Sequence, residues 1–437
     1  MDMRVGRLID ECINQGAQHV DCISVIAKKM QVDYVNGEFS INKSSSRVYV
    51  LRALVEGNWG LSLSFEPSME MVDQALSQAR AKGPGGVKLA KRRPVQGGYV
   101  MCQKKAIVDG DGSEVIDYVK AVVKNIEKQC QDAVKSIEVH IEASHTARAM
   151  MSSDGVNAYE LKPSIIASFT AQIASGESAS VEVCGSGGFE VLEGVNPRSI
   201  ADAISFRLNC MLKARQLNPY YKGFKFDVVL SPQTSASLIQ VVVESTLNAY
   251  SYRHDIDGIS DELTIIDDPT MDGGYGSFFF DDEGVKAKRK KLIESGKIVS
   301  LIHNRETAYM YGVEPTGNGR GLAEPPQPRH SNIIVEPGDW SFEEMIEETR
   351  IGLLIDGVRD VHVIDEYVML EPEAALVIKK GEVKEPVKIS YLATSLREFY
   401  SKIKGVGSGP LGSSPGSICD CKSASYSPPI KIELRAF

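Results

Sequence analysis

Four segments in the first half of the chain repeat apolar residues every three or four positions, and alternating or continuous apolar stretches lie between them. The helical spacing predicts helices, and the stretches between them predict strands. Two turn sequences, Asn36-Gly37 and Glu56-Gly57-Asn58, predict tight connections between neighbouring strands. The predicted helices cover residues 5–16, 67–79, 113–130 and 197–213, and the predicted strands cover residues 19–27, 31–41, 47–55, 60–65, 134–149, 158–175 and 180–184.

The order of these elements is helix, strands, helix, and then the same again after a basic, loop-like stretch that reaches about residue 112. This order indicates one α+β unit used twice, although no residue-level repeat accompanies it. We therefore expect an N-terminal α+β domain over residues 1–217. The polar segment 218–223 then reads as a linker.

Beyond the linker the pattern changes to short strands separated by glycine turns, which predicts a β-rich C-terminal domain over residues 224–437. A buried strand at 226–230 leads into a helix that Ser231-Pro232 begins, and Ser341 to Glu344 forms a capping box for another helix. Residues 392–403 are predicted to be helical, and the Gly-, Ser- and Pro-rich residues 405–416 are predicted to form a long loop. The fold class is α+β as a whole.

The composition is that of an ordinary globular protein, with 43% apolar and 24% charged residues among 437. The net charge of −9 disfavours general binding of nucleic acid or of an anionic membrane. No run of about 18 apolar residues predicts a transmembrane helix, and the first residues lack a signal-peptide pattern. Eight scattered cysteines do not form a disulfide framework, so the cytoplasm is the expected location.

Local catalytic motifs are few. His140 and His145 are the only two histidines within twenty residues of each other, and they lie on an alternating, strand-like segment. Residues five apart on a strand point to opposite faces, so these two cannot share a metal ion. No nucleophile elbow and no Walker loop is present, and a basic run at 286–291 is typical of a solvated hairpin strand.

The most unusual stretch is 267–321, where acidic pairs alternate with glycine-rich turns. Close backbone approach at these glycines favours either an elaborate set of turns or a groove for an extended peptide, and the residues alone leave both open. We expect Asp281, Asp282, Asn318 and Arg320 to shape the substrate side of such a groove without transferring protons. Arg320 is suited to a two-pronged contact with a peptide carboxylate.

At these residues the chain resembles the TldD/PmbA family, also called modulators of DNA gyrase. The resemblance covers nearly the whole chain, and its motifs are specific when they are taken together. The segments that carry it are Asn36-Gly37-Glu38, Gly57-Asn58-Trp59-Gly60, Asp267-Asp268-Pro269-Thr270, Phe280-Asp281-Asp282-Glu283-Gly284, Thr316-Gly317-Asn318-Gly319-Arg320-Gly321 and Glu336-Pro337-Gly338-Asp339.

The resemblance implies a heterodimeric zinc peptidase acting on unfolded or small peptides. In that family the TldD subunit holds zinc through His-Glu-x-x-x-His on a helix and a Cys near the C-terminus. This chain has Gln240, Val241 and Ser245 at the helix positions, and Cys419 near the position of the ligand Cys. The resemblance therefore implies a TldE/PmbA-like, non-catalytic subunit with no cofactor of its own and with zinc in a TldD-like partner.

Two other hypotheses about the function stay open. The chain could be a self-contained, homodimeric metallopeptidase of the same family, with ligands that the sequence does not reveal. It could also be a peptide- or nucleotide-binding module without a peptidase partner. A neighbouring coding sequence with His-Glu-x-x-x-His would favour the heterodimer over the self-contained peptidase. The sequence does not assign roles to Cys419 and Cys421.

Overall fold

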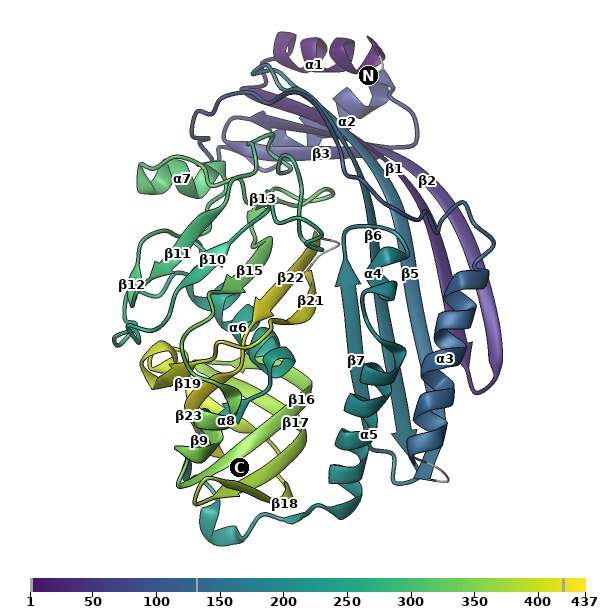
Figure 1. Ribbon diagram of the computed structural model, residues 1–437. Helices are drawn as coiled ribbons and strands as arrows, with labels where there is room; N and C mark the ends of the chain where they lie inside the picture. The colour runs from purple at the N-terminus through teal and green to yellow at the C-terminus, as the bar shows by residue number, and fades with distance from the viewer. Residues whose placement is uncertain (1–2, 131–132, 419–420) are drawn as a thin grey trace.

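The computed structural model describes residues 3–130, 133–418 and 421–437. Its first part is one long, curved sheet in the order β3-β2-β1-β5-β6-β4, with β7 also paired to β6 (Figure 1). The elements of this part are α1 Met3–Asn14, β1 His19–Val35, β2 Glu38–Val55, β3 Asn58–Ser64, α2 Met69–Arg80, β4 Gln96–Val100, α3 Ser113–Cys130, β5 Val134–Ser152, β6 Asn157–Ile173, β7 Ser178–Gly185, α4 Glu190–Glu193 and α5 Pro197–Lys213.

The centre of this sheet is the antiparallel pair β1–β5, with two further meander strands on either side of it. Helices α1 and α2 pack on the first three strands, and α3 and α5 pack on the second three. The element order that the sequence predicted is thus present, with one addition. The stretch predicted to be loop-like contains β4, which pairs in parallel with β6 and stands outside the otherwise symmetrical strand order about β1–β5. The predicted Asn36-Gly37 turn joins β1 to β2, with φ of 47° and 104° at its two residues.

The second part begins with β8 Arg215–Gln216 and the 3-10 turn η2 Pro219–Tyr221, and it contains two further large sheets. One of them has the order β12-β11-β10-β15-β22-β21. In the other, β16 pairs with both β9 and β17, so that β16, β9, β23, β19 and β17 close into a ring. The apolar side chains of both sheets and of helix α6 form the largest core cluster.

The elements of this second part follow in chain order, and they confirm the mixed α+β class. They are β9 Lys225–Leu230, α6 Pro232–Thr246, β10 Ile265–Asp267, β11 Lys290–Glu294, β12 Lys297–Ile298, α7 Arg305–Tyr311, β13 Gly319–Arg320, β14 Gln327–Pro328, β15 Asn332–Val335, α8 Phe342–Glu347, β16 Ile351–Ile364, β17 Tyr367–Lys379, β18 Glu382–Lys388, β19 Leu392–Ser395, η3 Phe399–Lys402, β20 Ile403–Val406, β21 Gly412–Ile418, β22 Cys421–Ser427 and β23 Ile430–Ala436.

Three local predictions were wrong. Residues 392–403 form strand β19 and the single turn η3, because β19 pairs with β23 on one side and β17 on the other, and a helix would leave backbone groups of both unpaired. The predicted loop 405–416 contains the ends of β20 and most of β21. The basic run 286–291 forms a strand only from Lys290, whose ammonium is buried against Asp267 at 2.7 Å.

The predicted capping box at Ser341 is confirmed, since its side chain accepts from Glu344 N–H and the Glu344 carboxylate accepts from Ser341 N–H. The two parts of the chain lie side by side along the long sheet, with β21 against β7 (Figure 1). The division between residues 217 and 224 stays a proposal. Among the described residues, no helix is both long and apolar enough to cross a bilayer.

Candidate functional site

A cavity of about 600 Å³ lies where the middle of the long sheet faces the glycine-rich loops of the second part. Strands β1, β2, β5 and β6 supply one wall, and the loops around β13 and the start of β22 supply the other. The lining combines apolar side chains with eight charged ones. The charged residues are Lys29, Arg148, Glu160, Lys162, Asp282, Arg320, Glu324 and Lys422.

Arg148 of β5 is the central cation of this cavity. Its guanidinium pairs with Glu160 of β6 at 2.9 Å and with Asp282 from the opposite wall. Burial would raise the pKa of Asp282, but Arg148 first, and then Arg320, bring that pKa below its usual value. Asp282 also accepts from Gly321 N–H at 2.8 Å, so it stays ionised and holds the loop against the sheet.

Arg320 also lines the cavity, where its guanidinium lies over the Phe278 ring at 4.6 Å. Its Nη2 donates to the Lys422 carbonyl at 3.2 Å, whereas its buried Nη1 has no hydrogen-bond partner among the described residues. Two lysines are close by. Burial lowers the pKa of Lys422 to about 8, and burial together with neighbouring Lys422 holds the pKa of Lys162 well below its usual value.

Of the four residues predicted for the substrate side, Asp282 and Arg320 line the cavity and the other two do not. Asp281 is fully buried and accepts hydrogen bonds from the N–H groups of Glu283, Val285 and Gly319. Asn318 is fully buried and donates to Asp267 at 2.8 Å. These two therefore fix the shape of the loops that carry Asp282 and Arg320, and substrate contact by Asp282 and Arg320 stays a prediction.

Helix α6 carries the three positions of the implied zinc motif. Gln240 is buried against β21, Val241 offers no ligand atom, and the Ser245 hydroxyl donates to the Val241 carbonyl at 2.8 Å. No group of three or more metal-binding side chains is present in the described part of the chain. The side chains of α6 therefore do not fit a zinc ion. The expectation that this chain holds no metal stays a prediction.

Neither cysteine near the C-terminus changes this picture. Cys419 lies outside the described residues. Cys421 is buried in the cavity wall, and burial raises the pKa of its thiol, so the metal-binding thiolate form is disfavoured. His140 pairs with Asp33 at 2.6 Å on β1, and β5 is a regular strand at His140 and His145, as predicted.

One polar pair that includes a residue of α6 was not predicted from the sequence. Nδ1 of the buried His330 lies 2.8 Å from a carboxylate oxygen of Glu244, and the two residues are 86 positions apart in the sequence. Burial would raise the pKa of Glu244, but the hydrogen bond and charge of His330 bring it below its usual value. No local spacing could have predicted this pair, because only the packing of α6 beside the segment before β15 brings it together.

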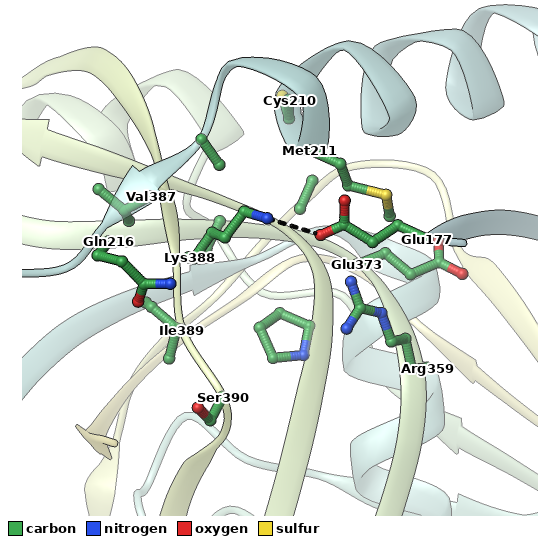
Figure 2. Close-up of a pocket in the computed structure, with 14 residues that line it drawn as sticks. Glu177, Cys210, Met211, Gln216, Arg359, Glu373, Val387, Lys388, Ile389 and Ser390 are labelled. Atoms are coloured by element: carbon green, nitrogen blue, oxygen red, sulfur yellow. Dashed lines mark hydrogen bonds and ion pairs between the residues drawn. The ribbon is translucent and has the colours of Figure 1, made fainter. Parts of the chain in front are cut away.

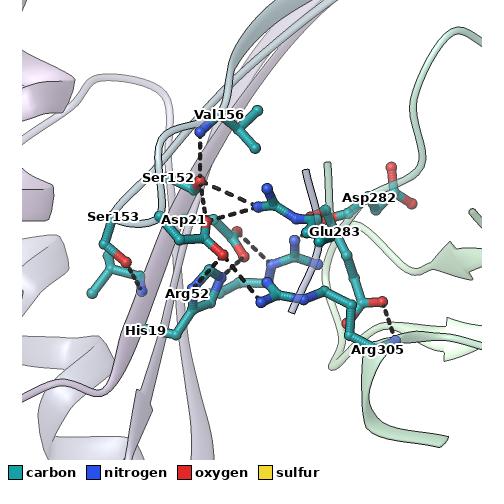
Figure 3. Close-up of polar contacts among 12 residues, drawn as sticks. His19, Asp21, Arg52, Ser152, Ser153, Val156, Asp282, Glu283 and Arg305 are labelled. Carbon is teal, nitrogen blue, oxygen red and sulfur yellow. Dashed lines mark hydrogen bonds and ion pairs between the residues drawn. The ribbon is translucent and has the colours of Figure 1, made fainter. Parts of the chain in front are cut away.

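A second polar cluster joins the two parts of the chain on the far side of Asp282 (Figure 3). Arg52 of β2 is fully buried and donates to Asp21 at 2.7 Å, to the Gly321 carbonyl at 3.0 Å and to the Asp282 carbonyl. Nearby, Glu283 accepts from the Arg305 N–H at 2.6 Å. Burial, and then the charge of Asp281, raise the pKa of Glu283 to about 8. These contacts tie the two parts of the chain together, so we call this cluster a clamp.

A smaller cavity of about 210 Å³ lies between α5 and the strands of the ring (Figure 2). Lys388 pairs with Glu177 across it at 3.0 Å, and Glu373 accepts from Arg207 at 3.2 Å. Burial raises the pKa of Glu373 to about 7. Its charges join α5 to the second part, so we assign it a structural role and take the larger cavity as the candidate site.

The fold and this cavity define an α+β protein of two parts with a polar, partly apolar chamber between them. Residues 224–434 match the family model described as the PmbA/TldA metallopeptidase C-terminal domain. A metalloprotease from Methanothermobacter thermautotrophicus is 30% identical over 375 residues, which cover 82% of this chain and 81% of that protein. The chain therefore belongs to the PmbA/TldD family, as its resemblance implied.

Other relatives agree with this assignment. The metalloprotease TldD homolog of Haemophilus influenzae is 25% identical, over 62% of this chain and 60% of that protein. The crystal structure of TldE from Thermococcus kodakarensis superposes with a TM-score of 0.78 at 16% identity, and the match covers 99% of both chains. A Thermotoga maritima protein described as a modulator of a DNA gyrase gives 0.76 at 19% identity, also over 99% of both chains. These structures share the fold.

Proposed function

We propose that this chain is the non-catalytic, TldE-like subunit of a heterodimeric zinc metallopeptidase, and that it pairs with a TldD-like subunit that holds the zinc. The observation that carries the proposal is helix α6. A zinc peptidase needs ligands and a general base on one helix face, and Gln240, Val241 and Ser245 cannot supply them. A chain of this family without that face needs a partner to take part in hydrolysis.

The cavity supports a role in holding peptide. Asp282 and Arg320 offer charged groups to a ligand, while Asp281 and Asn318 set the loop geometry behind them. In this proposal the chain completes the peptide-binding chamber and stabilises the catalytic subunit. The substrates are unfolded or small peptides, and the location is the cytoplasm, where the isolated cysteines of this chain stay reduced.

Assembly is the test. The chain is co-expressed with a TldD-like protein and analysed by light scattering, zinc content and hydrolysis of an unstructured peptide. We expect a one-to-one complex that buries roughly 2,000 Å² or more, as obligate interfaces do. We also expect zinc in the partner only, and hydrolysis by the complex.

The two alternatives correspond to other outcomes of this experiment. About one tightly held zinc per chain in the tag-free protein alone, together with hydrolysis by that protein, would show a self-contained homodimer. A chain that stays separate in the mixture and only binds peptide would show a binding module. Either outcome contradicts the proposal.

A further inference from the structure

Among the described residues, the charges that line the large cavity are not balanced within it. Arg148 is paired with Glu160 and Asp282, Lys29 is paired with Glu142 at 3.0 Å, and Glu324 is paired with Arg329 at 3.3 Å. Lys162, Arg320 and Lys422 remain, and none of them has a carboxylate within 4 Å among the described residues.

These three cations are held in place by neutral groups. Lys162 donates to the carbonyls of Tyr275 and Ser277, at 2.6 and 2.7 Å. Lys422 donates to two serine hydroxyls, Ser144 and Ser164. Arg320 is 8% exposed and keeps one buried N–H group without a partner. A buried donor left unpaired is expensive, so its retention here points to a ligand that completes it.

The surroundings of the two lysines change their protonation. Burial and then Lys422, Arg320 and Arg148 act against the charge on Lys162, which only Glu160 favours among its near neighbours. Burial lowers the pKa of Lys422 to about 8. An anion that enters the cavity would reverse this effect and draw protons onto both lysines.

The remaining wall of the cavity is apolar, with Val25, Val48, Leu322 and Phe278 among its residues. A volume of about 600 Å³ holds several amino-acid residues and far exceeds a single small anion. Cationic groups beside an apolar wall suit a carboxylate attached to an apolar side chain. Inorganic phosphate offers no group for that wall.

We propose that this cavity binds the free C-terminal carboxylate of a peptide whose last residue is apolar. Arg320 donates to the carboxylate, Lys162 and Lys422 supply the second charge, and the last side chain packs on Val25, Val48 and Leu322. This inference rests on the proposed function, and it names the end of the peptide that this chain holds. The catalytic partner would then receive the residues that precede the held end.

Calorimetric titration of the tag-free full chain at pH 8 tests the inference. The probes are the tripeptide alanyl-alanyl-leucine with a free carboxylate, the same tripeptide as its C-terminal amide, and inorganic phosphate. We expect the free acid to bind at least about tenfold more tightly than either of the others, because both the charge and the apolar wall are used only by the acid. Binding should take up protons, so the measured heat should change with the ionisation enthalpy of the buffer.

Variants distinguish the loss of a direct contact with the peptide from a loss of folding. Arg320→Ala should weaken binding of the free acid about tenfold to a hundredfold, and Arg320→Lys should recover only part of that loss. The exposed Arg397, which pairs with Asp257 on the surface, gives the matched control, and Arg397→Ala should leave affinity unchanged. Thermal unfolding of each variant verifies that it is folded.

Three results would overturn the inference: equal affinity for acid and amide, phosphate binding as tight as the free acid, or no binding by the isolated chain. These failures are distinct from failure of the proposed function. Zinc content and assembly with a TldD-like subunit do not depend on the affinity of this cavity for a tripeptide.

Discussion

Two buried arginines lie near Asp282, and their surroundings differ in one respect. Arg52 is fully buried, and each of its three nitrogens donates to the protein, to Asp21, Gly321 and Asp282. Arg320 is 8% exposed and donates once, to the Lys422 carbonyl. The first arginine lies in the clamp, where each of its nitrogens is hydrogen-bonded, and the second lines a cavity of about 600 Å³.

This difference separates a clamp from a binding surface. A guanidinium whose three nitrogens all donate within the protein stabilises the fold and has little left to offer a ligand. A guanidinium that lines a cavity and keeps a buried N–H without a partner costs stability in the free protein and is suited to a charged ligand. Truncation of the two arginines should therefore give opposite results for stability and for binding.

The largest effect is expected at the clamp. Arg52→Ala leaves the Asp21 carboxylate, which is 1% exposed, with His19 at 3.5 Å in place of its closest cation, and removes the donors that Arg52 supplies to two carbonyls. Breaking a buried ion pair from one side costs about 3–5 kcal/mol, so the urea midpoint should fall sharply or the chain should fail to fold. Arg320→Ala should cost no more than about 1–2 kcal/mol in the same measurement. Equal losses for both variants would contradict the comparison.

Much of the clamp's framework could be predicted from the sequence. Most helices and strands of the first part follow from local apolar periodicity, since most strands pair with a neighbour a short turn away, as at Asn36-Gly37. Strand β4 was missed, because it pairs in parallel with the distant β6. The second part was harder. Residues 392–403 have helical spacing, but pairing of β19 with β17 and β23 decides their structure, and those partners are distant in sequence.

The candidate site shows the same limit. Asp282 and Arg320 were singled out because acidic pairs and glycines are concentrated around them, and both line the cavity. Lys162, Lys422 and Arg148 were missed, because they lie singly on strands whose alternation reads as a solvated face. The pair of Glu244 with His330 was missed for a different reason, because a contact between residues 86 positions apart leaves no local pattern.

The clamp should also make stability depend on pH. Burial and Asp281 raise the pKa of Glu283 from 4.5 to about 8, so the folded state keeps a proton that the unfolded chain releases. The free energy of unfolding should therefore fall as pH rises from about 5 to about 8, by about 1–3 kcal/mol. Urea titrations at several pH values measure this slope. Glu283→Gln should flatten it above pH 6, and an unchanged slope would remove Glu283 from the explanation.

A smaller effect of opposite sign is expected in the cavity. Burial lowers the pKa of Lys422 from 10.5 to about 8, so its charge opposes folding at pH 7 and this penalty disappears as pH rises from 8 to 10.5. Lys422→Met should raise the free energy of unfolding at pH 7 by up to about 1 kcal/mol, measured by urea titration. The two serines tolerate the change because Ser144 and Ser164 still hydrogen-bond each other at 2.9 Å. The gain should shrink at pH 10. A loss of stability at pH 7 would show that Lys422 belongs to a clamp after all.

The smallest effect tests whether charge in the cavity acts on a ligand. Glu324 lines the cavity and pairs with Arg329 at 3.3 Å, and its side chain is 39% exposed, so its field inside the cavity is partly screened by solvent. Glu324→Gln removes a negative charge from the wall and should tighten binding of alanyl-alanyl-leucine by about two- to fivefold. The same change at exposed Glu382, on strand β18, provides the control and should leave affinity unchanged. If Glu324→Gln weakens binding, the carboxylate of Glu324 itself contacts the ligand, and the peptide end that enters the cavity is the cationic one.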